Sequence, residues 1–155
     1  DVASLALNLM QSPIAILAPS ELEPAMIRFK NQLNENSARF ARIGAFPEMN
    51  HNEAVAWGGV GDDQDPAANE QALILMSWDG LHPRVEQRMD WFVSNCPTDS
   101  AWRLHGEGEN LLEAMLHLCI MQDWLSIALG LLHGKDPSAI GPIISLKEHL
   151  AQIDQ

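Results

Sequence analysis

Two stretches of the chain, residues 14–18 and 72–78, are apolar at nearly every position, and prolines stand on either side of the first. Runs of this length and composition fit β-strands that are buried on both faces. Strands of this kind occur where helices cover both sides of a parallel sheet. The two runs therefore favour an α/β fold.

Further strands are expected at residues 39–46 and 101–105, and helical patterns lie between the strands. After Ser20, apolar residues recur at steps of four, three and four residues, at Leu22, Met26, Phe29 and Leu33. This spacing predicts a helix that ends near residues 34–37. Strands that alternate with helices predict a doubly wound, mainly parallel sheet flanked by helices. Ligands bind such folds outside the carboxyl ends of the strands.

The chain has 155 residues and 46% hydrophobic content, which is enough for one domain with a buried core, so residues 1–155 are expected to form a single domain. Residues 58–69 are rich in glycine and aspartate and are expected to form an acidic surface loop. The chain opens with Asp1 and not with methionine, which suggests a domain cut from a longer protein.

The charge balance excludes several classes of partner. Nine Lys and Arg stand against 21 Asp and Glu, giving a net charge of −12, which argues against nucleic acid and anionic membranes. The long apolar stretch 110–132 carries Glu113 and Asp123, which are costly at a bilayer centre, so a buried helix is expected there. Cys96 and Cys119 show no metal or disulfide spacing, and a reducing cytoplasm is expected.

Three helix starts are expected at capping boxes, in which a polar cap precedes a glutamate by three residues. They are Ser20 with Glu23, Asn50 with Glu53, and Ser145 with Glu148.

Three charged or titratable residues then stand at unfavourable helix positions. Glu35 falls in the last turn of its helix, where a carboxylate holds its proton more tightly than a free glutamate, as suits a general base. Lys147 falls near the positive start of the closing helix, and His51 falls at a helix start that keeps imidazole neutral. The alternatives are a solvated glutamate at a frayed end, a lysine that extends into solvent, and a surface histidine.

Several segments together resemble the C-terminal half of the bacterial and archaeal bifunctional phosphoglucose/phosphomannose isomerases, which pair two sugar isomerase (SIS) domains. These segments are Gln32-Leu33-Asn34-Glu35-Asn36-Ser37-Ala38, Pro47-Glu48-Met49-Asn50-His51-Asn52-Glu53, Gly134-Lys135-Asp136-Pro137-Ser138 and Leu146-Lys147. The resemblance runs from the strand at residue 14 to the closing helix. It implies an SIS-type, flavodoxin-like three-layer sandwich.

The resemblance also implies roles for individual residues. Glu35 would move a proton between C1 and C2 of glucose 6-phosphate or mannose 6-phosphate through a cis-enediol, giving fructose 6-phosphate. His51 would assist ring opening from the other subunit of a homodimer, and Lys147 would lie near the ring oxygen or hydroxyls. The substrate contacts would be Asn34, Asn50 and Ser138.

Neither a metal nor another cofactor is expected for this reaction. In the family, the phosphate is held largely by an upstream SIS domain, whose phosphate loop does not occur in this chain. The alternative is a non-catalytic SIS module that binds a sugar phosphate or only dimerises. A metal or nucleotide enzyme has no motif in the sequence.

Overall fold

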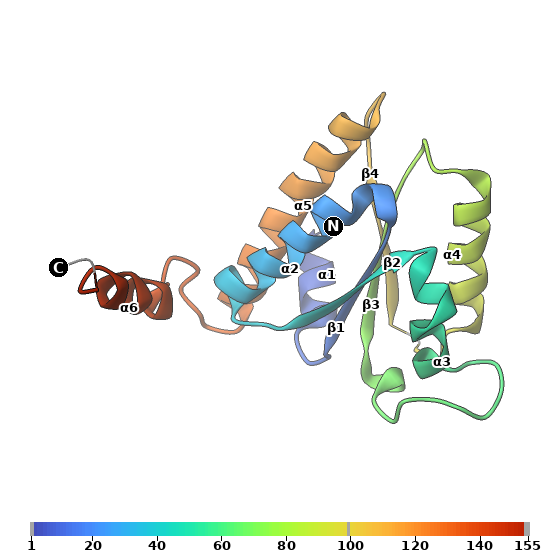
Figure 1. Ribbon diagram of the computed structural model, residues 1–155, viewed down its shortest axis with the longest axis horizontal. Coiled ribbons are helices and arrows are strands. Elements are labelled where there is room, and N and C mark those ends of the chain that lie inside the picture. Colours follow the sequence, from blue (N-terminus) through green and yellow to red (C-terminus); the bar gives the residue numbers. More distant parts are fainter. Residues whose placement is uncertain (1, 99, 154–155) are drawn as a thin grey trace.

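A computed structural model describes residues 2–98 and 100–153 of the chain. Four parallel strands form one sheet in the order β2-β1-β3-β4, and Figure 1 shows helices on both sides of it. The strands are β1 (Ile14–Pro19), β2 (Ala41–Phe46), β3 (Ala72–Trp78) and β4 (Ala101–Gly106). The predicted doubly wound parallel sheet is confirmed. The chain reverses its direction of winding between β1 and β3.

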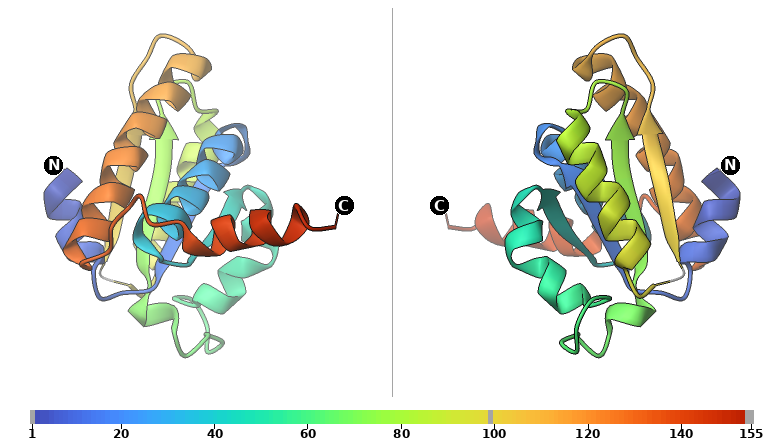
Figure 2. Two further views of the ribbon diagram at one scale, coloured as in Figure 1. Left: turned by 90° about the vertical axis from the view of Figure 1, so that its left-hand side faces the viewer. Right: turned by 90° about the vertical axis from the view of Figure 1, so that its right-hand side faces the viewer.

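The helices divide into two layers, one on each side of the sheet in Figure 1, and the two views of Figure 2 show each layer in front of the sheet. One face is covered by α1 (Val2–Leu9), α2 (Glu23–Ser37) and α5 (Leu111–Leu132). The other face is covered by the 3-10 helix η2 (Glu48–His51), α3 (Glu53–Trp57) and α4 (Pro83–Asn95). The molecule is therefore a three-layer sandwich.

Alternate side chains of the central strands point to opposite faces of the sheet and pack in two hydrophobic cores, one on each face. Along β1, Ile14 and Ile16 pack in the core beneath α2 and α5, whereas Ala15 and Leu17 pack against the α4 layer. All residues of β1 are buried. This confirms that the continuous apolar run is a strand covered on both faces.

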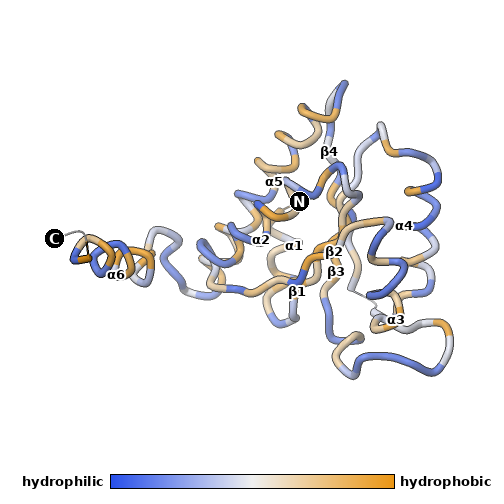
Figure 3. The backbone as a smooth tube through the Cα atoms, viewed as in Figure 1, coloured by the Kyte–Doolittle hydropathy of each residue, from blue (hydrophilic) through white to orange (hydrophobic). Residues whose placement is uncertain are grey.

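Helix α5 is apolar around most of its circumference, as Figure 3 shows. By length and composition alone it is a candidate membrane span. Its inner side packs on α1, α2 and β4 and is buried at Leu118, Leu125 and Leu129. Its outer side forms a ridge that is between 56% and 65% exposed in this chain, made of Leu112, Leu116, Ile120 and Trp124.

All three predicted capping boxes are wrong in detail. Ser20 begins a 3-10 turn, η1 (Ser20–Leu22), and α2 follows without a side-chain cap. Asn52, and not Asn50, caps α3 by accepting a hydrogen bond from the Glu53 amide. The closing helix α6 (Gly141–Leu150) begins before Ser145, because Pro142 suits the first turn of a helix.

Two segments extend from the body of the sandwich. Every residue of α6 is exposed, and Figure 1 shows the helix projecting away from the layers. Between α3 and β3, residues 59–66 are exposed and lie outside helices and strands, while Ala68 of the short helix η3 (Ala68–Glu70) is buried.

Candidate active site

A groove of about 400 Å³ opens where α2 ends and the segment leading to α6 crosses it. Its polar lining comes from α2 at Asn31, Asn34 and Glu35, and from Lys135 after α5. Its apolar lining is Ala38, Ala139, Ile140, Pro142 and Ile143. The structure thus brings together two predicted residues, Asn34 and Glu35, with a lysine for which the sequence suggested no role.

Glu35 is exposed at the groove, in the last turn of α2. Within residues 2–98 and 100–153, its carboxylate has neither an ion pair nor a hydrogen-bond donor. The neighbouring Asn36 is engaged, since its Nδ2 atom donates to Ser126 Oγ at 2.8 Å. The Glu35 carboxylate is therefore free to accept a proton from a molecule in the groove.

Lys135 ties the end of α2 to the loop that follows α5. Its ammonium donates to the Glu35 carbonyl at 2.8 Å and to the carbonyls of Asp136 and Ala139 at 3.0 Å and 3.4 Å. A cation at a helix C-terminus offsets the negative end of the helix dipole. The Lys135 ammonium therefore offsets part of the negative charge of the helix dipole at the C-terminal end of α2, next to Glu35.

Ser138 lies in the loop beside the groove but does not line it. Its main-chain N–H donates to Asp136 Oδ1 at 2.9 Å and its hydroxyl donates to the same oxygen at 2.7 Å. These hydrogen bonds lower the pKa of Asp136. The hydroxyl is thus already used to shape the loop.

Lys147 does not lie where the sequence predicted. Because α6 starts at Gly141, Lys147 falls in its last turn together with His149, where a cation is favoured. It follows the groove residue Ile143 by four positions and so lies on the same side of α6, about one 5.4 Å turn further on. Lys147 therefore lies beyond the outer end of the groove, away from the sandwich.

His51 lies on the opposite side of the sheet from Glu35. It ends η2, whose Met49 packs in the core with α4, while α2 packs in the core with α5. His51 is exposed and stands before the α3 cap, not at the first position of the helix. Asn50 lines a separate hollow between α3 and α4. One copy of the chain therefore cannot join His51 to Glu35.

Residues 1–150 match the family described as "Bacterial phospho-glucose isomerase C-terminal SIS domain". The chain belongs to this family. Its SIS domain is 34% identical over 127 residues to the bifunctional phosphoglucose/phosphomannose isomerase of Aquifex aeolicus, covering 79% of the chain and 38% of that protein. The protein of the same name from Caldicellulosiruptor bescii is 29% identical over 128 residues, covering 81% and 37%.

Solved structures share the fold of this SIS domain. A glucose-6-phosphate isomerase like protein from Thermus thermophilus has a TM-score of 0.70 at 15% identity, covering 90% of this chain and 46% of that one. The C-terminal domain of glucosamine-fructose-6-phosphate aminotransferase from Francisella tularensis has a TM-score of 0.69 at 12% identity, covering 89% and 41%. The SIS domain thus spans less than half the length of the relatives it matches.

Sequence patterns did not indicate the apolar lining of the groove or two of its polar residues, Lys135 and Asn31. Lys135 belongs to the Gly134 to Ser138 segment that carries the resemblance. Its hydrogen bond to the carbonyl of Glu35, 100 residues earlier in the chain, cannot be predicted from local sequence patterns. Asn31 lies four residues before Glu35 and could have been found from helical periodicity.

Proposed function

We propose that this SIS domain supplies part of the active site of an aldose–ketose isomerase that interconverts glucose 6-phosphate, or mannose 6-phosphate, with fructose 6-phosphate. Family membership supports an isomerase of phosphosugars. The observation that carries the proposal is the Glu35 carboxylate, which has no partner among the described residues and stands at a groove with both polar and apolar lining.

Glu35 acts as the base in this mechanism. It removes the proton from C2 of the open-chain aldose, which gives a cis-enediolate. The proton on O2 passes to O1, and Glu35 returns its proton to C1 to give the ketose. Asn34 and Ser138 contact the sugar hydroxyls, Ser138 after its hydroxyl leaves Asp136. Lys147 reaches the ring oxygen or a hydroxyl from the outer end of the groove.

His51 assists ring opening in the groove of a second copy. The position of His51 and Glu35 on opposite faces of the sheet supports this arrangement, because a site that uses both residues needs two chains. Asn50 belongs to the other hollow, and we assign its ligand separately.

The phosphate of the sugar that Glu35 isomerises is bound outside the SIS domain that supplies this Glu35, by an upstream domain or the second copy. Among the described residues that line the groove, only Lys135 is cationic, and its ammonium already donates to three carbonyls. The exposed ridge of α5 and the exposed apolar residues of α6 are the surfaces for these partners. A cytoplasmic location stays a prediction from the sequence.

The test is the turnover of Glu35→Gln in the full-length protein. Loss of a general base lowers turnover by roughly 10²–10⁴-fold, so conversion of glucose 6-phosphate should fall by that amount. Glu23→Gln, at the other end of α2, is the matched control and should keep its turnover. Near-normal turnover of Glu35→Gln would favour the non-catalytic module instead.

The 155-residue chain alone is expected to show little or no isomerase activity. Robust activity of this piece would show that the phosphate is bound within it, contrary to the proposal.

A further inference from the structure

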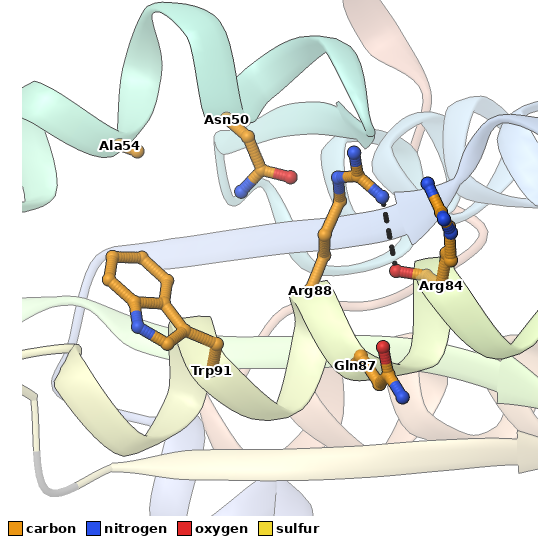
Figure 4. A pocket seen from close by; sticks show the side chains of 6 residues that line it. All are labelled: Asn50, Ala54, Arg84, Gln87, Arg88 and Trp91. Atoms are coloured by element: carbon orange, nitrogen blue, oxygen red, sulfur yellow. Dashed lines mark hydrogen bonds between the residues drawn. The ribbon is translucent and has the colours of Figure 1, made fainter.

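A hollow of about 580 Å³ lies between α3 and α4, on the face of the sheet opposite to the Glu35 groove. Figure 4 shows its six lining side chains, which come from η2, α3 and α4. They are Asn50, Ala54, Arg84, Gln87, Arg88 and Trp91. The proposed isomerase mechanism gives this hollow no role.

Two arginines that have no carboxylate partner among the described residues form one wall. Arg84 and Arg88 are four residues apart on α4, a spacing at which like charges repel each other. Within the described part of the chain neither forms an ion pair, whereas Arg28, Arg42 and Arg103 each pair with a carboxylate.

One guanidinium contact within the hollow is to the main chain, from Arg88 Nη1 to the Arg84 carbonyl at 3.2 Å. Within residues 2–98 and 100–153, most donors of both side chains have no hydrogen-bond partner. In a chain of net charge −12, two adjacent unpaired cations in a hollow favour an oxyanion ligand, because guanidinium groups match phosphate geometry.

Asn50 supplies an independent observation on the facing wall. Its Oδ1 atom is buried and has no hydrogen-bond partner among the described residues. Figure 4 shows this side chain directed into the hollow, across from Arg88. An unsatisfied buried acceptor is costly, and a ligand hydroxyl would satisfy it. The ligand should therefore carry hydroxyl groups as well as an anion.

Trp91 completes the hollow with a flat apolar surface that is 53% exposed. An exposed indole face suits the C–H face of a small ring. We propose that this hollow binds a phosphosugar, with its phosphate on Arg84 and Arg88, a hydroxyl on Asn50, and its ring against Trp91. The ligand class is that of the proposed substrate, but this site lies apart from Glu35.

Arginine labelling in the full-length protein tests the site directly. Phenylglyoxal modifies exposed arginines, and mass spectrometry of peptides reports each one separately. The Glu35→Gln variant is used, so that the ligand is not consumed and binding is scored without isomerase activity. Glucose 6-phosphate should slow labelling of Arg84 and Arg88 several-fold and leave Arg103 unchanged. Inorganic phosphate should protect more weakly, and glucose should not protect.

Two further variants place a carboxylate in the hollow. Asn50→Asp and Gln87→Glu should each weaken the protection by glucose 6-phosphate about tenfold, because the added charge repels phosphate or occupies the arginines. Gln87 is exposed, so this variant keeps the fold even if Asn50→Asp does not.

Three results would overturn the site. They are equal labelling of Arg84 and Arg88 with and without glucose 6-phosphate, arginines that are unreactive before any ligand is added because a partner already covers them, and protection that survives Gln87→Glu. None of these depends on whether Glu35 is the base of an isomerase.

Discussion

The C-terminal end of α2 depends on one residue with an unusual backbone. Ala38 has a φ of 52°, in the left-handed region, and its N–H donates to the Leu33 carbonyl. The next amide, of Arg39, also donates to Leu33 at 3.1 Å. A residue with a Cβ atom is strained in this conformation by roughly 1–2 kcal/mol. The turn that presents Glu35 is therefore less stable than it could be.

Replacement of Ala38 by glycine should stabilise the domain. Glycine adopts the left-handed region without strain, and the free energy of unfolding should rise by about 1 kcal/mol, less the greater entropy of the unfolded chain. Urea denaturation measures the change. Ala56→Gly, within α3, is the control and should destabilise by a similar amount. A lower free energy of unfolding for Ala38→Gly would contradict the proposal that the left-handed conformation of Ala38 is strained.

A second prediction for a single residue concerns the pKa of the Asp136 carboxylate. Hydrogen bonds from Ser138 lower the pKa of Asp136, so they stabilise the fold above the usual titration range of aspartate. That contribution is lost as the pH falls through the lowered pKa. In Ser138→Ala the pKa of Asp136 should rise toward its ordinary value, and the stability that depends on its ionisation should become smaller. Carboxyl NMR titration measures the pKa, and an unchanged value would contradict this cause.

At the scale of elements, α2 and α5 cross closely because Gly130 has no side chain. A Cβ atom at this position would lie 2.3 Å from the Asn36 carbonyl oxygen. Polar contacts flank the crossing, including Arg28 Nη2 to Asp123 Oδ2 at 3.0 Å. The crossing holds the end of α2, and so Glu35, at a fixed place against α5.

Gly130→Ala should therefore force the two helices apart. Overpacking of a tight contact costs about 1–3 kcal/mol, and thermal unfolding should show a lower midpoint. Gly141→Ala is the matched control, because a Cβ atom at Gly141 meets nothing within 4 Å. Equal stability of the two variants would show that the helices adjust without strain.

The elements themselves were largely predictable, but their first residues were not. The strands at residues 14–18 and 72–78 follow from short continuous apolar runs, whose length fits strands that are buried on both faces. The start of a helix depends on which of several polar side chains accepts a hydrogen bond from the first main-chain N–H groups of the helix. Asn50 and Asn52 are both good caps, and only the packing of Met49 in the core selects Asn52.

The candidate site was predictable only in part, for a related reason. Its residue types came from the resemblance to the SIS isomerases, and Glu35 does lie at a groove. Lys147 was predicted near a helix start because Ser145 was expected to be the cap, whereas the cap of α6 is Ile140, five residues earlier. The contact of Lys135 with Glu35 joins segments far apart in the chain, which local patterns cannot show.

At the scale of the whole molecule, the sheet separates Glu35 from His51, and this predicts complementation between inactive variants. Glu35→Gln and His51→Ala should each be inactive alone. In mixed dimers of the full-length protein, one of the two shared sites receives both intact residues, so an equal mixture should regain about a quarter of the normal activity. Isomerase assays after co-expression measure the recovery.

The control for this experiment uses two residues on the same side. Glu35 and Lys147 both belong to the groove side of one chain, so Glu35→Gln mixed with Lys147→Ala should regain nothing. Recovery in this control, or none with His51→Ala, would contradict a site shared in the proposed way.

The sheet between Glu35 and His51 also bears on how the activity would respond to dilution. A site assembled from two chains exists only in the associated fraction. At concentrations well below the dissociation constant of the pair, the rate should rise with the second power of the protein concentration and not in proportion to it. The amount of protein in the cell would then set the activity of each chain.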